Sequence, residues 1–282
     1  MVDVFRKVIS LITLILFIGI LVSCSFERKL AREYIKSEEK RSVLIIPPDY
    51  LFKTSLKEWQ VDSIDEIDEW TQDSILFENS LYLKNIDDSV LLEYYISNYI
   101  NELKAYGFNV YGKDSLMSFL NGQQNAFIIN MAQLEIEEYV MPIKEEAEYG
   151  EYIYFEVIDL NAVNLNSWFE ISRVNDNESV DVFFTSLYAT DDLEGFFTFN
   201  YFTGEVGFRY SIDTLRIDEI YQLSAIAGYT YAGYTFDYLM NAYIQKRLLE
   251  EGQYSSNIYY HYNRRKKYLV PASEERRFLP ME

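Results

Sequence analysis

Few residues of this chain could act as a nucleophile or as a base near neutral pH. The 282 residues include one cysteine, Cys24, and one histidine, His261. Nucleophilic catalysis requires a serine, threonine or cysteine that a neighbouring base activates. No G-x-S-x-G turn, which presents the serine of many hydrolases, occurs in the sequence. Because His261 lies among tyrosines next to a basic cluster, we do not expect a hydrolase of this type.

The residue types also argue against a metal centre. Zinc sites draw on cysteine, histidine and carboxylates, and this chain has only one histidine and one cysteine. Oxygen ligands for calcium occur at Asp62, Asp65 and Asp68, and at Asp176 and Glu178. Neither group has the D-x-[DN]-x-[DN]-G pattern of a calcium-binding loop. We interpret both groups as solvated acidic surface and expect no metal and no cofactor.

A pair of carboxylates is the remaining catalytic possibility. Glu135 and Glu137 alternate with apolar residues, so they share one face of a predicted strand. Like charges at this spacing raise the pKa of one partner, as the acid of a glycosidase requires. An exposed strand end explains the same pattern. We therefore predict a protein that is not an enzyme, and a carboxylate-dependent hydrolase stays the weaker alternative.

The sequence around Cys24 indicates lipid chemistry at its thiol. Arg6 and Lys7 precede an apolar run from Val8 to Val22, and Ser23 and the cysteine follow. A basic start, a short apolar core and small residues at the cleavage point are the parts of a secretory signal. A membrane span needs about 20 apolar residues, which is more than this run offers. An ordinary signal peptide or an N-terminal anchor helix is the alternative interpretation.

With Leu21, Ser23 and Cys24 at its informative positions, the end of this signal resembles the lipobox of bacterial lipoproteins. The abundance of Tyr, Asn, Asp, Glu and Ile resembles that of Bacteroidota lipoproteins. The resemblance implies that residues 1–23 are removed and that acyl chains on Cys24 bind the protein to outer-membrane lipid. Ser25 is not the aspartate that retains enterobacterial lipoproteins at the inner membrane. We expect an outer-membrane protein that faces the periplasm. A location on the cell surface is the remaining alternative.

The composition excludes one class of partner. The formal net charge is −20, whereas nucleic-acid-binding surfaces are basic because they displace counterions from phosphates. We therefore exclude nucleic acid. A single cysteine allows no intramolecular disulfide, so the domain depends on its core. The 26 tyrosines fit half-buried strands or an interface.

Strands and helices alternate in the first half of the predicted domain, and strands dominate the second. Apolar runs and helical spacing predict strands at 42–48, 108–111 and 126–139 and helices at 91–106 and 115–120. Strand-like runs separated by short polar turns follow at 152–160, 168–174, 180–188, 196–202 and 206–211. A long helix, or two consecutive ones, is predicted at 219–250. Small residues such as Gly228 would let this helix lie close to a sheet.

These elements predict an α/β (α+β) fold with a mixed sheet, flanking helices, an antiparallel meander and a long closing helix. The predicted parts are a signal peptide (1–23), a lipidated tether (24–41), a single α/β domain (42–250) and an aromatic-basic C-terminal tail (251–282). Within the domain we expect an α/β part (42–145), a β-meander (150–212) and the helix (219–250). The order loosely resembles the periplasmic α/β domains of the curli-export lipoprotein and the TolB N-terminal domain, and it implies no functional residues.

Aromatic and basic side chains alternate in the C-terminal segment, as they do in interface hot spots. The predicted partner-binding residues are Tyr259, Tyr260, Tyr262, Arg264, Arg265, Lys266, Lys267, Arg276 and Arg277. Docking on an acidic partner, on anionic lipid or on the chain's own domain stays open, as does a solvated end.

The expected function is that of a non-enzymatic accessory or structural subunit of an envelope assembly, in export, β-barrel insertion or envelope maintenance. Its expected partners are outer-membrane lipid, through acylated Cys24, and other envelope proteins. The alternative is a surface lipoprotein that binds glycans or nutrients. In that case Trp59, Trp70, Trp168 and Tyr201 would be platforms for sugar rings.

Overall fold

The structure is a computed structural model that describes residues 26–37, 41–57, 69–120, 126–174, 180–255 and 257–281. The predicted signal peptide, Cys24, Trp59 and both acidic groups considered for calcium lie outside these ranges.

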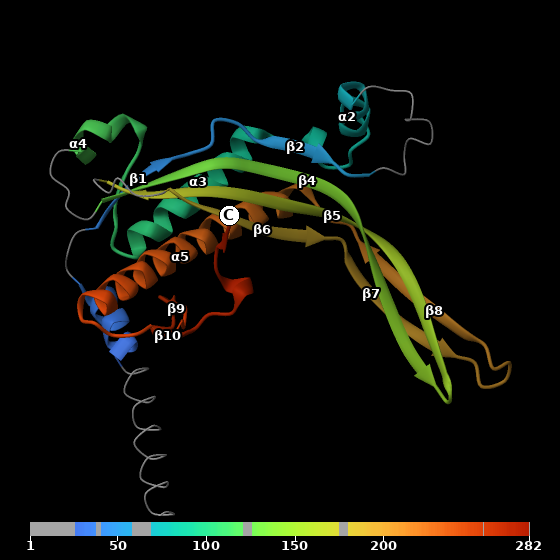
Figure 1. Cartoon of the computed structure of the whole chain (residues 1–282). Coiled ribbons are helices and arrows are strands. Elements are labelled where there is room, and N and C mark those ends of the chain that lie inside the picture. The colour runs from blue at the N-terminus through green and yellow to red at the C-terminus, as the bar shows by residue number, and fades with distance from the viewer. Residues whose placement is uncertain are drawn as a thin grey trace, which may run out of the picture.

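Within the described residues, seven strands form one mixed sheet at the centre of the molecule (Figure 1). They are β1 (Ser42–Ile46), β2 (Phe52–Ser55), β3 (Asn109–Tyr111), β4 (Ala126–Tyr149), β5 (Tyr152–Arg173), β6 (Asp181–Thr190) and β11 (Leu279–Pro280). The order is β11-β6-β5-β4-β1-β3. Strand β1 is parallel to β3 and β4, and β2 pairs further along β4. Strands β4, β5, β6 and β11 are antiparallel. The predicted α/β fold with a mixed sheet is confirmed.

Two helices, α3 (Asp88–Ala105) and α5 (Ile217–Glu250), cover one face of this sheet (Figure 1). Tyr99 of α3 stacks on Phe169 of β5, with the ring centroids 5.9 Å apart. The predicted closing helix is a single helix, because α5 is continuous from Ile217 to Glu250. The shorter helices are α2 (Glu69–Glu78), α4 (Leu116–Leu120), the 3₁₀ turns η3 (Leu83–Asn85), η4 (Lys113–Ser115) and η5 (Glu274–Arg276), and residues 26–36.

Gly228 brings α5 close to α3 rather than to the sheet. A Cβ atom at this position would lie 2.2 Å from the main-chain oxygen of Tyr95. One turn earlier, the Ser224 hydroxyl donates a hydrogen bond of 2.7 Å to the Leu91 carbonyl. The small residue was predicted to permit a close contact, and the structure shows that the contacting element is a helix.

Strand β5 is continuous where two strands, 152–160 and 168–174, were predicted. The residues between them pair with β4 throughout. The stretch between the two runs contains Asn161, Asn164 and Asn166, and asparagines are rare in strands. Here their polar groups are satisfied inside the sheet: Asn164 donates to Asn166 Oδ1 at 2.9 Å and to Glu137 Oε2 at 3.2 Å. Because the Asn164 amide is hydrogen-bonded in this way, the strand can continue through this position.

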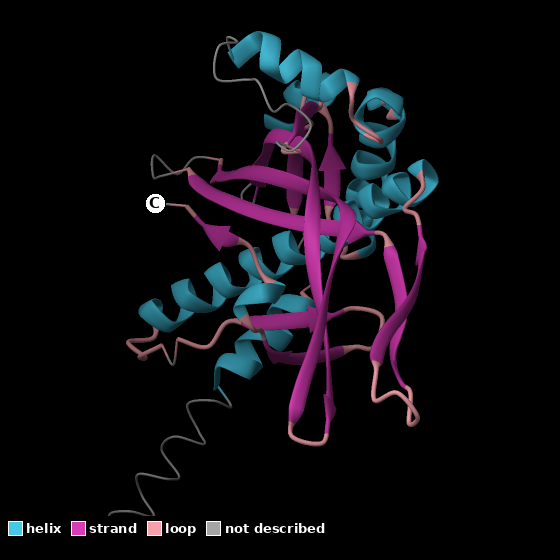
Figure 2. Cartoon of the chain, turned by 90° about the vertical axis from the view of Figure 1, so that its right-hand side faces the viewer, coloured by secondary structure: helices cyan, strands magenta, loops and turns pink. Residues whose placement is uncertain are grey.

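The predicted meander is wrong for its last two strands. Strands β7 (Asp192–Phe199) and β8 (Val206–Asp213) pair only with each other among the described strands. The far halves of β4 and β5 extend past the central sheet, and β7–β8 runs beside them (Figures 1 and 2). Tyr149 joins the two hairpins, because its ring stacks on Phe199 at 5.4 Å and its hydroxyl donates to the Phe197 carbonyl at 3.3 Å. We call residues 142–159 and 192–213 the arm.

A buried ion pair marks the place where the arm leaves the sheet. Lys57 Nζ lies 2.6 Å from Glu138 Oε1, and both side chains are almost fully excluded from solvent. Lys57 also donates to Asn161 at 2.9 Å. The carboxylate of Glu138 accepts hydrogen bonds from the N–H groups of Leu81, Tyr82 and Leu83. Buried charges are tolerated when they are paired and hydrogen-bonded in this way.

Both ends of the described chain pack on the domain. In the N-terminal helix, Leu30, Ala31 and Tyr34 are buried, so this part of the predicted tether (24–41) belongs to the core. At the other end, β9 (Tyr260–Asn263) pairs with β10 (Tyr268–Pro271), and β11 pairs with β6. The segment 251–282 is therefore part of the domain rather than a tail outside it. No helix in the described ranges has the length and apolar character that a membrane crossing requires.

Candidate functional site

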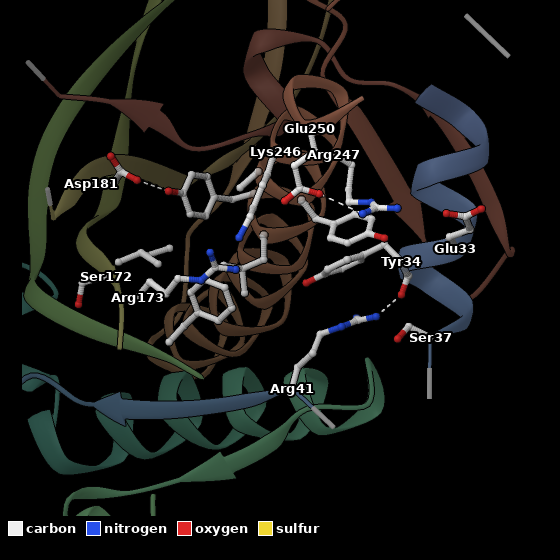
Figure 3. A pocket seen from close by; sticks show the side chains of 16 residues that line it. Glu33, Tyr34, Ser37, Arg41, Ser172, Arg173, Asp181, Lys246, Arg247 and Glu250 are labelled. Atoms are coloured by element: carbon white, nitrogen blue, oxygen red, sulfur yellow. Dashed lines mark hydrogen bonds and ion pairs between the residues drawn. The ribbon is translucent and has the colours of Figure 1, made fainter. Parts of the chain in front are cut away.

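The N-terminal helix, α5 and one edge of the sheet surround a cavity of about 680 Å³ (Figure 3). Its walls come from the N-terminal helix, from the starts of β4 and β6, from the end of β5 and from the last turns of α5. The volume lies within the range of about 300–1,000 Å³ that is typical of small-molecule sites. This cavity is the candidate functional site.

The side chains of Arg41, Arg173 and Lys246 reach this cavity from different elements (Figure 3). Arg41 precedes β1, Arg173 ends β5 and Lys246 lies on α5. The guanidinium of Arg41 lies 3.6 Å from the ring centroid of Tyr34, and that of Arg173 lies 5.3 Å from the ring of Phe127. Contact with a ring restricts the orientation of a guanidinium.

The carboxylates described at the cavity are engaged by other residues. The cavity is lined by four cationic side chains, Arg41, Arg173, Lys246 and Arg247, and by three carboxylates, Glu33, Asp181 and Glu250, so the formal charge of its lining is +1 although the whole protein carries −20. The pairs are Glu33 with Lys29 at 3.9 Å, Asp181 with the Tyr238 hydroxyl, and Glu250 with Arg247 at 3.0 Å.

Tyr34 adds a buried hydroxyl to the site. Its side chain is 6% exposed, and the hydroxyl has no hydrogen-bond partner in good geometry among the described residues. Burial raises the pKa of Tyr34 to about 12, despite the nearby charges of Arg41 and Arg173. The phenol is therefore protonated at neutral pH and can donate a hydrogen bond. Together these groups can bind and orient an anion.

The predicted carboxylate pair lies elsewhere, on the face of the sheet opposite α3 and α5. Thr54 donates a hydrogen bond of 2.7 Å to Glu135, and Asn164 donates one of 3.2 Å to Glu137. Both carboxylates are thus part of a polar ladder across β2, β4 and β5. In the described part of the chain, no three side chains of the metal-ligating types come together.

The aromatic residues predicted as sugar platforms lie on separate elements. Trp70 is exposed on α2, and Tyr201 is exposed in the loop between β7 and β8. Trp168 is half-buried on β5 and packs against Phe184, with centroids 5.0 Å apart. These side chains do not form a common surface, and Trp59 lies outside the described residues.

Most of the predicted partner-binding residues contact their own domain. Asn241 of α5 donates to the carbonyl of Tyr260 at 2.8 Å and accepts from its N–H at 2.9 Å. Arg264 donates two hydrogen bonds to Glu102 of α3, at 2.8 and 3.0 Å. The other members lie as follows: Tyr262 is half-buried against α5, Arg277 stacks on Tyr259, and Arg265, Lys266, Lys267 and Arg276 are exposed. The aromatic-basic pattern of this segment is thus largely explained by docking on α3 and α5.

The cationic pocket was not predicted from the sequence. Arg41, Arg173 and Lys246 are more than 70 residues apart in the sequence, so no local motif marks them as one site. The strand directions relate two of these residues to each other. Strand β4 is parallel to β1 and antiparallel to β5, so the residue before β1 and the last residue of β5 lie at the same edge of the sheet. Two arginines, Arg41 and Arg173, occupy these positions.

No protein-family model matches this sequence, and a search of curated proteins found no match. The function is therefore argued from the geometry described above.

Proposed function

We propose that the protein is a non-enzymatic lipoprotein of the outer membrane that faces the periplasm and serves as an accessory subunit of an envelope assembly. Its anchor would be an acylated Cys24. The observation that carries the proposal is an exposed apolar row on the arm. Ile153, Phe155 and Val157 alternate along β5, and their side chains are 64%, 62% and 53% exposed. Contiguous exposed apolar surface marks sites of interaction.

The row lies on the outer face of the β4–β5 hairpin. The inner face of this hairpin is covered by β7–β8 through Tyr149. Side chains of directly opposed residues on paired antiparallel strands point to the same face of the sheet. The outer face of the hairpin therefore also presents the residues of β4 that pair with the row. These are Lys144 opposite Val157, Glu146 opposite Phe155 and Glu148 opposite Ile153. The arm therefore offers an apolar row beside a charged, mainly acidic one.

This pattern favours a protein partner over a lipid bilayer. Insertion of the apolar row into lipid would also bring Glu148 and the ion pair of Lys144 with Glu146 into the membrane, and burial of charged side chains is costly. A protein surface with an apolar strip beside basic side chains would satisfy both rows. In Figures 1 and 2, the arm tips and the start of the N-terminal helix both lie in the lower part of the view, on opposite sides of the molecule in Figure 1. A partner on the arm would thus lie near the membrane that the anchor enters.

Site-specific cross-linking tests the proposal. A photo-reactive amino acid replaces Phe155 in the full chain, and cells are irradiated before mild detergent extraction. We expect one discrete envelope protein to be cross-linked and to co-purify without cross-linking. The matched control carries the reactive group at Leu249, which is 78% exposed on α5 and outside the arm.

A variant with serine at 153, 155 and 157 should fold normally and lose the partner, because these side chains lie outside the core. Identical products from positions 155 and 249, or unchanged co-purification of the serine variant, would contradict the docking function. An unmodified Cys24, found by mass spectrometry, would contradict the anchor. Protease treatment of intact cells distinguishes periplasmic from surface exposure.

A further inference from the structure

We propose that the cationic pocket binds a phosphate monoester of a small organic group. The site lies at the sheet edge beside the N-terminal helix, away from the arm, and the proposal does not depend on the docking function.

One cation of the cavity, Arg41, is buried. Arg41 is 9% exposed, and its contacts are the carbonyl and ring of Tyr34. Among the described residues, no carboxylate lies within ion-pair distance of Arg41 or of the exposed Lys246. A buried cation without a counter-charge is costly. An anionic ligand would remove this cost, so the pocket is complementary to an anion.

The donors of the cavity come from different parts of the chain. Arg41, Arg173, Lys246 and the Tyr34 hydroxyl belong to four separate segments around the cavity (Figure 3). A carboxylate has two acceptor oxygens in one plane and is satisfied by one guanidinium. A phosphate group has more oxygens in a tetrahedral arrangement and can carry two charges. Donors that approach from several directions therefore suit a phosphate better.

The volume of the cavity, about 680 Å³, is much larger than a phosphate group requires. The remaining wall includes the rings of Phe127, Tyr238 and Tyr243 and the side chain of Leu239. These surfaces would contact an organic group attached to the phosphate. A bare phosphate ion would leave them unused.

The phosphate could come from a lipid headgroup or from a soluble ester. Tyr34 lies eight residues beyond residue 26, about 12 Å along the helix axis at 1.5 Å per residue. If Cys24 is acylated, lipid headgroups of the same membrane are within reach of the pocket. A soluble phosphoester would enter from the periplasm.

Titration calorimetry of the purified full chain tests the site with three probes. These are inorganic phosphate, glycerol 3-phosphate and short-chain dihexanoyl phosphatidic acid below its micellar concentration. We expect saturable binding of an ester, and weaker binding of inorganic phosphate. Preference for the diacyl probe assigns the site to a lipid headgroup, and preference for glycerol 3-phosphate assigns it to a soluble ester.

Two variants place the binding in the pocket. Arg173→Gln and Tyr34→Phe should each weaken the preferred ester by about tenfold, because each removes a hydrogen bond to a charged group. Tyr34→Phe keeps the ring and its packing, so it remains informative if Arg173→Gln does not fold. Lys267→Gln is the control, since it removes one charge from an exposed turn.

Absence of binding by all three probes would overturn the proposal. Equal weakening by Lys267→Gln would also overturn it, since it would show non-specific attraction to a cation. Succinate binding as tightly as the best ester would replace the phosphate assignment with a carboxylate one. None of these results depends on the arm, so cross-linking at residue 155 tests the docking function separately.

Discussion

His261 Nδ1 of β9 lies 2.6 Å from Asp237 Oδ2 of α5, and this contact helps to hold the C-terminal strands on the long helix. The other oxygen of Asp237 accepts the N–H of Tyr262 at 2.9 Å. The carboxylate is fully buried, and burial raises its pKa from 3.8 to about 6, although His261 opposes this shift. The single histidine of the chain thus takes part in packing its C-terminal segment.

Replacement of Asp237 by asparagine should alter how stability depends on pH. Because the carboxyl pKa is higher in the folded than in the unfolded state, the stabilisation from this group is full below about pH 4 and is lost as the pH rises through 6. Asp237→Asn cannot titrate. Relative to the wild type, the free energy of unfolding of the variant should increase by up to about 3 kcal/mol from pH 4 to pH 7, at 1.36 kcal/mol per pKa unit. Urea unfolding of both proteins across this pH range measures the free energy of the variant minus that of the wild type. A difference that stays constant or falls as the pH rises would contradict the prediction.

Gly228→Ala should destabilise the contact between α3 and α5. The added methyl group would lie 2.2 Å from the Tyr95 carbonyl oxygen, so the helices must separate. We expect a loss of about 1–3 kcal/mol in the free energy of unfolding, as for other overpacked cores. Gly233→Ala is the matched control in the same helix, because its Cβ would lie at an ordinary 3.4 Å from the Tyr106 hydroxyl. There the higher helix propensity of alanine should add up to about 1 kcal/mol. Thermal unfolding compares the two, and equal effects would refute the steric explanation.

Lys57→Met should be strongly destabilising because it leaves Glu138 buried without its cation. Removal of one partner from a buried ion pair costs about 3–5 kcal/mol. Lys144→Met removes a lysine that pairs with Glu146 on the exposed arm, where such pairs contribute about 0–1 kcal/mol. Denaturant unfolding of the two variants should therefore differ clearly. Similar losses would mean that the pair at the base of the arm is not important for stability.

Truncation after Gln253 should prevent stable folding. It removes Tyr260 and Phe278, whose side chains are 0% and 3% exposed, and each buried aromatic side chain contributes about 1.5–3 kcal/mol. Circular dichroism and thermal melting should show loss of the cooperative transition. Removal of residues 281–282 alone is the control and should have little effect. A truncated protein with an unchanged melting temperature would restore the interpretation of this segment as a separate tail.

Local patterns predicted many elements because their causes are local. The apolar run at β1, the helical spacing of α3 and the turn at Gly107, whose φ is +92°, were all predicted from neighbouring residues. The division of β5 was wrong because the polar stretch between its two apolar runs is stabilised by contacts across the sheet, such as those of Asn164, which local patterns do not show.

The sequence alone determined the element types, the acidic character, the single thiol and the signal pattern before it, since each depends on residues close together in the chain. Only the tertiary structure decided that the C-terminal segment docks on α3 and α5, that Phe155 faces outwards, and that Arg41, Arg173 and Lys246 meet. These features depend on strand register and helix packing, which set distances between residues far apart in sequence. Residue type and spacing do not specify those distances.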